Sequence, residues 1–174
     1  TDATRSALIA AARGSFVAKG YAGTNTPDVA EAAKVTRGAL YHHFENKRDL
    51  FHAVIDAEQE ALANDIEDAT SDDSDPIDAL IEGGRAYFKS MQAPGRTRLL
   101  LVDAPAILSR DELEAIDDRH GGRTLREALN VALKQGVLKS LPLNELSYIL
   151  SGVYDRAALA IDAGQEPLRN DGAQ

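Results

Sequence analysis

Side chains suited to contacts with a DNA duplex are concentrated between residues 26 and 47. An arginine can donate two parallel hydrogen bonds to a guanine edge, and an alanine methyl can meet a thymine methyl. Hydroxyl, imidazole and ammonium groups suit phosphates, and a glycine lets a helix approach the groove closely. The predicted DNA contacts are Thr26, Thr36, Arg37, Gly38, Ala39, Tyr41, His42, His43 and Lys47.

Within this set, Arg37 is the candidate for reading a base edge, because it falls at the start of a predicted helix. Tyr41 has two open interpretations, a phosphate contact through its hydroxyl or a mainly core position through its ring. The adjacent pair His42 and His43 does not favour a metal site, since neighbouring side chains on a helix point about 100° apart. We predict no metal and no cofactor.

Two short helices must position these side chains. Thr26 and Pro27 read as a cap and first-turn pair, and the first helix is expected to end near Ala33. Thr36 is expected to cap the second helix, whose apolar residues are Leu40, Tyr41 and Phe44. A helix of two turns is not stable alone, so its neighbours must hold it while its outer face is offered to the major groove.

Longer helices are expected on both sides of this pair. The pattern predicts a helix over residues 2–19 that Gly20 closes, with Phe16 in the core of the fold. Asn46 is the predicted cap of a long helix over residues 47–69. The inward residues of that helix are expected to be Leu50, Phe51, Val54, Ile55 and Leu62.

The residues of this region closely resemble the N-terminal domain of the tetracycline-repressor (TetR) family. The resemblance covers about the first fifty residues without a gap and rests on Phe16, Gly20, Tyr21, Thr24, Val29, Ala30, Val35, Gly38, Leu40, Tyr41, His43, Phe44, Lys47, Leu50 and Phe51. One position departs from the family, which usually has glycine where this chain has Lys34. If this position adopts the left-handed backbone conformation, a residue other than glycine costs on the order of 1 kcal/mol in conformational energy.

The rest of the chain also predicts helices and no strands. A helix should begin at Asp75-Pro76 and stop before Pro94, with an apolar stripe made of Ile77, Leu80, Ile81, Tyr87, Phe88 and Met91. Residues 99–102 are expected to form a buried helix that Pro105 breaks. A capping box at Ser109 and Glu112 should start a helix to about Lys134, kinked near Gly121, and a last helix should cover residues 143–163.

The predicted fold class is therefore all-α, with a three-helix DNA-binding domain over residues 1–46 and a connecting helix over 47–69. Residues 70–174 form the predicted effector-binding and dimerisation domain. The resemblance implies an effector pocket in this second domain for a small, apolar molecule. Its candidate residues are Tyr87, Phe88, Met91, Arg98, Leu101, Asp103, His120, Tyr148 and Tyr154.

Homodimer formation is expected because a single recognition helix reads only a few base pairs. The last two long helices are the natural dimer surface, paired with their copies as a four-helix bundle. The residues expected in it are Leu125, Leu129, Leu146, Ile149, Leu150, Val153 and Ala157. The alternative, that both helices only cover the core of their own domain, stays open.

Charge is unevenly distributed along the chain. The net charge is −9, but residues 1–48 hold seven lysines and arginines against four acidic residues, a net of +3. The positive part can dock on phosphates while the acidic remainder favours solubility. No apolar run reaches the length of a membrane span, and the absence of cysteine excludes disulfides and thiolate chemistry. A cytoplasmic location is therefore expected.

These observations favour a ligand-responsive transcriptional regulator, and the resemblance implies a repressor that binds a pseudo-palindromic operator. An enzyme is disfavoured, because the sequence has no glycine-rich phosphate loop and no spaced His/Glu metal motif. The remaining alternative is a helical dimer that binds small molecules and has lost tight DNA binding, suggested by the acidic total and by Lys34.

Overall fold

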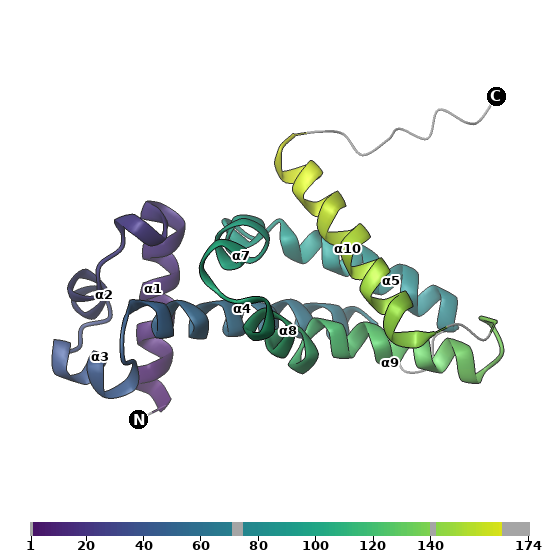
Figure 1. Ribbon diagram of the computed structural model, residues 1–174, viewed down its shortest axis with the longest axis horizontal. Coiled ribbons are helices and arrows are strands. Elements are labelled where there is room, and N and C mark those ends of the chain that lie inside the picture. Colours follow the sequence, from purple (N-terminus) through teal and green to yellow (C-terminus); the bar gives the residue numbers. More distant parts are fainter. Residues whose placement is uncertain (1, 71–74, 140–141, 165–174) are drawn as a thin grey trace. The chain divides into compact units, whose positions relative to one another are not determined.

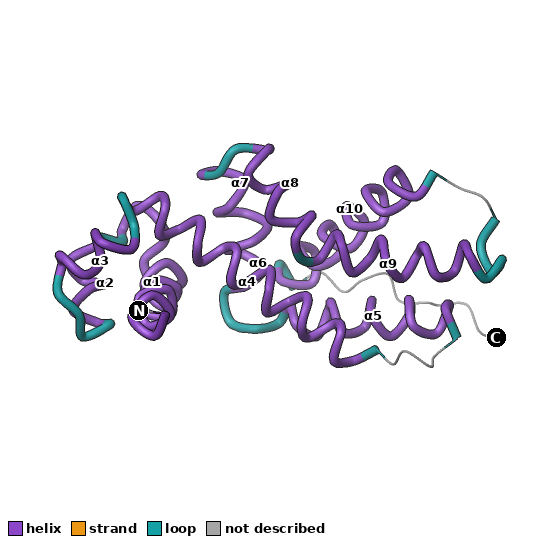
Figure 2. The backbone as a smooth tube through the Cα atoms, turned by 90° about the horizontal axis from the view of Figure 1, so that it is seen from below, coloured by secondary structure: helices purple, strands orange, loops and turns teal. Residues whose placement is uncertain are grey.

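The structure is a computed structural model that describes residues 2–70, 75–139 and 142–164. Throughout these ranges the chain consists of helices and connecting loops, with no strand (Figures 1 and 2). The predicted all-α class is thus confirmed. Every described helix is too short or too polar to cross a lipid bilayer.

The chain divides into two compact units, each made from two separate stretches. Unit 1 contains residues 1–60 and 94–116, and unit 2 contains residues 61–93 and 117–174. The chain therefore passes from one unit to the other three times, after Glu60, after Ala93 and after Ile116. The proposed functional division near residue 70 stays a prediction.

Unit 1 begins with α1 (Asp2–Gly23), α2 (Thr26–Ala32) and α3 (Arg37–His43), followed by the first part of α4 (Lys47–Ala69) (Figure 1). Gly20 has φ 70° and ψ 173°, so regular helix geometry is interrupted there, as the sequence predicted. Helices α1, α2 and α3 contact one another pairwise. The three helices pack together, and within α3 itself Leu40 is the buried residue.

The cap of α2 differs from the expectation. Asn25 is the N-cap residue, and its side chain accepts a hydrogen bond from the backbone N–H of Asp28 at 2.9 Å. Thr26, predicted as the cap, is the first helical residue instead. Asparagine and threonine are both good capping residues, and with Asn25 as the cap Pro27 still falls in the first turn of α2.

Aromatic rings fill the centre of unit 1. Phe16 is fully buried, and its ring centroid lies 5.0 Å from that of Phe51 and 5.9 Å from that of Tyr21. The edge-to-face contact between Phe16 and Phe51 is a favourable ring geometry. The predicted inward residues of α4, namely Leu50, Phe51, Val54, Ile55 and Leu62, are all buried.

The second stretch of unit 1 contains α6 (Arg96–Arg98), the π-helix η1 (Leu99–Asp103), α7 (Ala104–Ile107) and the first part of α8 (Arg110–Arg119). Two expectations about this stretch were wrong. Pro105 lies in the first turn of α7, where its missing N–H is not needed, and the helix continues to Ile107. Val102 is 51% exposed, whereas Leu99 and Leu100 are buried.

Unit 2 is built mainly from α5 (Pro76–Met91), α9 (Gly121–Lys134) and α10 (Leu143–Asp162), which contact one another pairwise. Asp75 caps α5, as predicted, by accepting from the backbone N–H of Ile77 at 2.9 Å. The predicted stripe of α5 was partly wrong, because Ile77 and Ile81 are exposed while Met91 is buried. The predicted kink near Gly121 is a complete break at His120, which separates α8 from α9. Residues 165–174, after the last helix, lie outside the described part of the chain.

Candidate nucleic-acid interface

Helix α3 is held at both ends by local contacts. The Thr36 hydroxyl accepts the backbone N–H of Ala39 at 3.1 Å, which confirms the predicted cap. Leu40 is fully buried and Phe44 almost so, and these two side chains fix one side of the helix to the core. Lys34, in the turn before α3, has φ 56°, the left-handed conformation that the resemblance to a glycine position suggested.

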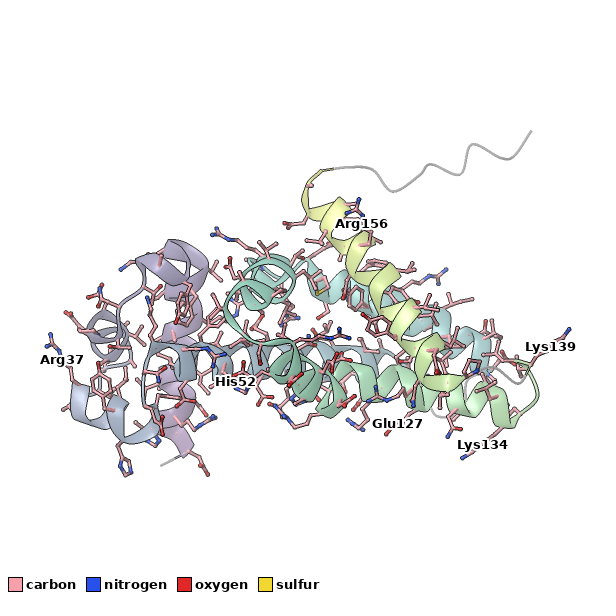
Figure 3. The ribbon with its side chains drawn as sticks, viewed as in Figure 1. Arg37, His52, Glu127, Lys134, Lys139 and Arg156 are labelled. Carbon is pink, nitrogen blue, oxygen red and sulfur yellow. The ribbon has the colours of Figure 1, made fainter. Side chains whose placement is uncertain are left out.

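The other side of α3 faces outward. Arg37 and His42 are exposed, and Figure 3 shows Arg37 projecting from α3 away from the helices behind it. Gly38 is also exposed, and a Cβ added there would meet only the Thr36 hydroxyl, at 3.9 Å. The fold itself therefore does not require glycine at this position. The absence of a side chain matters only to a partner that approaches from outside.

Two predicted phosphate contacts bind each other. The hydroxyls of Thr26 and Tyr41 lie 2.9 Å apart, which joins the start of α2 to α3. Thr26 is largely buried, whereas Tyr41 is 54% exposed. The Tyr41 ring is thus available at the surface, and its hydroxyl is held in a defined place by Thr26.

The ammonium group of Lys47 lies against the end of α1. It donates to the backbone carbonyls of Tyr21 and Thr24 at 2.9 and 3.0 Å and lies 4.4 Å from the centroid of the Tyr21 ring. These contacts stabilise the turn that follows the kink of α1, a role that the sequence did not indicate. The predicted contact of Lys47 with phosphate would require its ammonium to share or leave these carbonyls.

Basic side chains lie near the end of α3. Arg5 of α1 lies over the Phe44 ring, with its guanidinium carbon 5.4 Å from the centroid. Desolvation lowers the pKa of the His43 imidazole, and the nearby His42 and Arg5 lower it further. The rings of His42 and His43 have centroids 5.4 Å apart, and no cluster of three metal-binding side chains occurs among the residues that the structure describes.

Comparisons with known proteins identify this arrangement. Residues 8–54 match the model of the bacterial regulatory proteins of the tetR family, and residues 77–172 match the tetracyclin repressor-like C-terminal domain. The chain belongs to the tetR family. It is a transcriptional regulator of the helix-turn-helix class.

Individual relatives agree with this assignment. The chain is 33% identical over 147 residues to the HTH-type transcriptional regulator TtgR of Pseudomonas putida, covering 78% of this chain and 68% of TtgR. It is 33% identical over 162 residues to the probable acrEF/envCD operon repressor of Escherichia coli, covering 87% and 72% of the two chains. The crystal structure of a TetR-family regulator from Pectobacterium atrosepticum matches with a TM-score of 0.74 and 30% identity, over 94% of this chain and 83% of that one.

The residues predicted to bind an effector in this TetR-family chain fall into three groups. Tyr87, Phe88 and Tyr154 form a cluster in unit 2, with ring centroids 5.4 to 5.5 Å apart. Arg98, Leu101 and Asp103 belong to unit 1. Tyr148 is 72% exposed on α10, while Met91 is buried and His120 lies at the break between α8 and α9.

Two partly buried carboxylates adjoin the aromatic cluster. Tyr87 donates its hydroxyl proton to Asp155 at 2.7 Å. Burial raises the pKa of the Asp155 carboxyl, although the bond from Tyr87 opposes this. Burial also raises the pKa of Asp117, Arg126 lowers it, and the negative charge of Asp155 raises it again. The interior of unit 2 is therefore polar beside its rings, a feature that the sequence analysis missed.

The predicted dimer residues have different environments. Ile149 and Val153 of α10 are 61% and 59% exposed, whereas Leu129 of α9 is buried within unit 2. Leu125, Leu146, Leu150 and Ala157 are partly exposed. The exposed apolar residues of α10 are therefore the part of the predicted set that is accessible to a second copy.

Ion pairs across unit 1 were also missed. The buried carboxylate of Glu58 accepts from Arg13 at 2.7 and 3.2 Å and from Arg96 at 3.0 Å. Arg48 donates to both oxygens of Glu112, which also accepts from the backbone N–H and hydroxyl of Ser109. Arg48 and then Ser109 lower the pKa of Glu112 to about 2. The sequence separations of these pairs are large, so no periodic pattern could reveal them.

Proposed function

We propose that this regulator binds a pseudo-palindromic operator as a homodimer, that α3 reads the major groove, and that it acts as a repressor in the cytoplasm. The outward face of α3 carries this proposal. Arg37 and the open position at Gly38 have no evident purpose within unit 1, but both suit the approach of a helix to base edges.

Dimerisation is supported by the exposed apolar side chains of α10. A soluble chain rarely leaves residues such as Tyr148, Ile149 and Val153 together on one helix without a partner. Pairing of this helix with its copy would give a dimer with two recognition helices. Such a dimer can bind two half-sites that lie about one helical turn apart on the same duplex.

The proposed effector is a small, mainly apolar molecule that binds in unit 2 beside Tyr87, Phe88 and Tyr154. A ligand that prefers one spacing of the two recognition helices would change the population able to bind DNA. The 33% identical relative from Escherichia coli is named as an operon repressor, which supports repression as the outcome for this chain.

Selection of binding sequences from a random duplex pool, at near-physiological salt, tests the proposal. Recovery of a pseudo-palindrome with half-sites about one helical turn apart would support a dimeric, sequence-specific regulator. Enrichment of no sequence would instead favour the second candidate, a helical dimer that binds small molecules and has lost tight DNA binding. In that case, mass spectrometry of small molecules that copurify with the chain distinguishes a protein whose DNA binding is blocked by bound ligand from one that has lost DNA binding.

The selected operator allows the roles of Arg37 and Lys47 to be separated. We expect Arg37→Ala to cost about 1–3 kcal/mol at one base position and to relax specificity there. Lys47→Ala should weaken all sequences alike, and thermal unfolding of the same variant measures how much of the loss comes from the carbonyls of Tyr21 and Thr24. The same loss of specificity from both substitutions would contradict this division.

A further inference from the structure

Arg48 and Glu112 form a bidentate ion pair within unit 1. The Nη1 and Nη2 atoms of Arg48 lie 2.7 and 2.5 Å from the two carboxylate oxygens of Glu112. Resting on the proposed DNA-binding function, we propose that Arg48 is a further contact to the DNA backbone and that Glu112 withholds it in the DNA-free protein.

The position of Arg48 supports a backbone contact. It is the second residue of α4 and follows the end of α3 at His43 by five positions. Lys47, the other cation of this turn, already binds the carbonyls of Tyr21 and Thr24. Arg48 is therefore the cation at the start of α4 that can change partners without loosening α1, and its side chain is 45% exposed.

The chemistry of the pair supports an exchange with phosphate. A carboxylate offers two oxygens to the planar guanidinium fork, and a phosphate offers the same arrangement. Glu112 thus occupies Arg48 in the way that a DNA phosphate would. Exposed ion pairs are weak, whereas a phosphate contact is strengthened by the release of counterions from the duplex.

Glu112 also keeps hydrogen bonds when Arg48 leaves. Its Oε2 atom accepts from the Ser109 backbone N–H at 2.7 Å and from the Ser109 hydroxyl at 2.8 Å. The carboxylate therefore retains its place in the capping box of α8. This makes the exchange local, because neither α4 nor α8 has to unfold at its start.

The test is a double-mutant cycle on the selected operator duplex, with wild type, Glu112→Gln, Arg48→Gln and the double variant measured at several salt concentrations. Glutamine maintains the capping box but removes the charge. We expect Glu112→Gln to bind about threefold to fivefold more tightly, the factor for one exposed ion pair. The salt dependence of Glu112→Gln should stay close to that of wild type, because Arg48 reaches the phosphate in both complexes. Arg48→Gln should weaken binding and make the salt dependence shallower by about 0.9, which corresponds to one phosphate. In the double variant, the tightening by Glu112→Gln should disappear.

Glu114→Gln is the matched control. Glu114 lies on the same helix and pairs with Arg110 at 2.6 Å, so this substitution also removes one negative charge from beside an arginine. It should leave affinity unchanged. Equal tightening by both glutamate substitutions, or tightening that persists without Arg48, would overturn the proposal and indicate a general charge effect.

The failure of this inference differs from the failure of the proposed function. If the wild-type chain binds no duplex, both are overturned. If it binds the operator while Glu112→Gln leaves affinity unchanged or weaker, only the role of Glu112 and Arg48 is overturned. Should Glu112→Gln not fold by circular dichroism, Arg48→Gln alone decides, because unchanged affinity in that variant overturns the backbone contact.

Discussion

Arg13 of α1 donates to both carboxylate oxygens of Glu58 in α4, at 2.7 and 3.2 Å. The same carboxylate accepts from Arg96 at 3.0 Å, and Arg13 also donates to the carbonyl of Pro94 at 3.0 Å. Burial would raise the pKa of Glu58, but the hydrogen bonds from Arg13 and Arg96 hold it below its usual range. One buried anion thus joins three segments of unit 1.

Glu58→Gln should destabilise the protein by about 3 kcal/mol, because it removes the buried anion that pairs with both Arg13 and Arg96. Urea denaturation measures the change, and Glu114→Gln, on the exposed surface, should stay within about 0.5 kcal/mol of wild type. The depressed pKa means that the stabilisation by Glu58 is present above the unfolded pKa and is lost as pH falls through the folded one. An equal loss in both variants would contradict a special role for the buried anion.

Gly38→Ala should separate folding from DNA binding. An added Cβ meets only the Thr36 hydroxyl, so the substitution should stabilise α3 by about 0.5–1 kcal/mol while its methyl obstructs close approach to the groove. Gly14→Ala is the control, since Gly14 is another exposed helical glycine with nothing within 4 Å of an added Cβ. Thermal unfolding and operator affinity should show both variants stabilised and only Gly38→Ala weakened in binding. Unchanged operator affinity in Gly38→Ala would argue against α3 as the reading helix.

Val153→Asp should prevent dimer formation. It places a charge beside the exposed Tyr148 and Ile149 on α10, where pairing with a second copy would bury it without a partner. Val102→Asp is the control, because Val102 is a similarly exposed valine of unit 1. Sedimentation velocity should show a monomer for the first variant and a dimer for the second. A dimer in both variants would show that the dimer interface does not include this part of α10.

Asp155→Asn should stabilise the protein at neutral pH. Because burial raises the pKa of Asp155, the ionised carboxylate opposes folding above that pKa, and this penalty disappears as pH falls through it towards the unfolded value of about 3.9. Asparagine can still accept the proton of Tyr87. Thermal unfolding at a series of pH values should show a gain at pH 7 that shrinks towards pH 4.

The matched control for this prediction is Glu127→Gln, which neutralises an exposed carboxylate of α9 in the same unit (Figure 3). Its effect should be small at every pH, since exposed pairs at this spacing contribute little. A gain in Asp155→Asn that does not depend on pH would indicate better packing rather than relief of charge burial.

Sequence reasoning worked best where the deciding chemistry is local. The caps at Thr36, Asn46 and Asp75 and the box at Ser109 depend on side chains within three residues of the N–H groups that they accept, so the helix starts could be read directly. The burial of Leu50, Phe51 and their neighbours follows from helical periodicity in the same way. The DNA contacts came from side-chain type and resemblance, and their assignment stays a prediction.

Relationships between distant segments could not be read in this way. Nothing in the spacing of Arg13, Glu58 and Arg96 indicates that they meet. The carbonyl partners of Lys47 could not be predicted either, because they lie more than twenty residues earlier in the chain. The prediction that Pro105 breaks a helix was wrong because the sequence does not distinguish a proline that ends a helix from one in the first turn of the next. Here the π-helix η1 ends at Asp103, and Pro105 falls in the first turn of α7.

The three passages of the chain between its units have a consequence for building chimeras. Because unit 1 takes in residues 94–116 as well as 1–60, a fragment cut after α4 would lack Arg96 and Glu112, the partners of Glu58 and Arg48. Exchange of unit 2 between such regulators should therefore use three junctions, at residues 60, 93 and 116, rather than one. A graft made on this plan would keep the internal ion pairs of unit 1 intact.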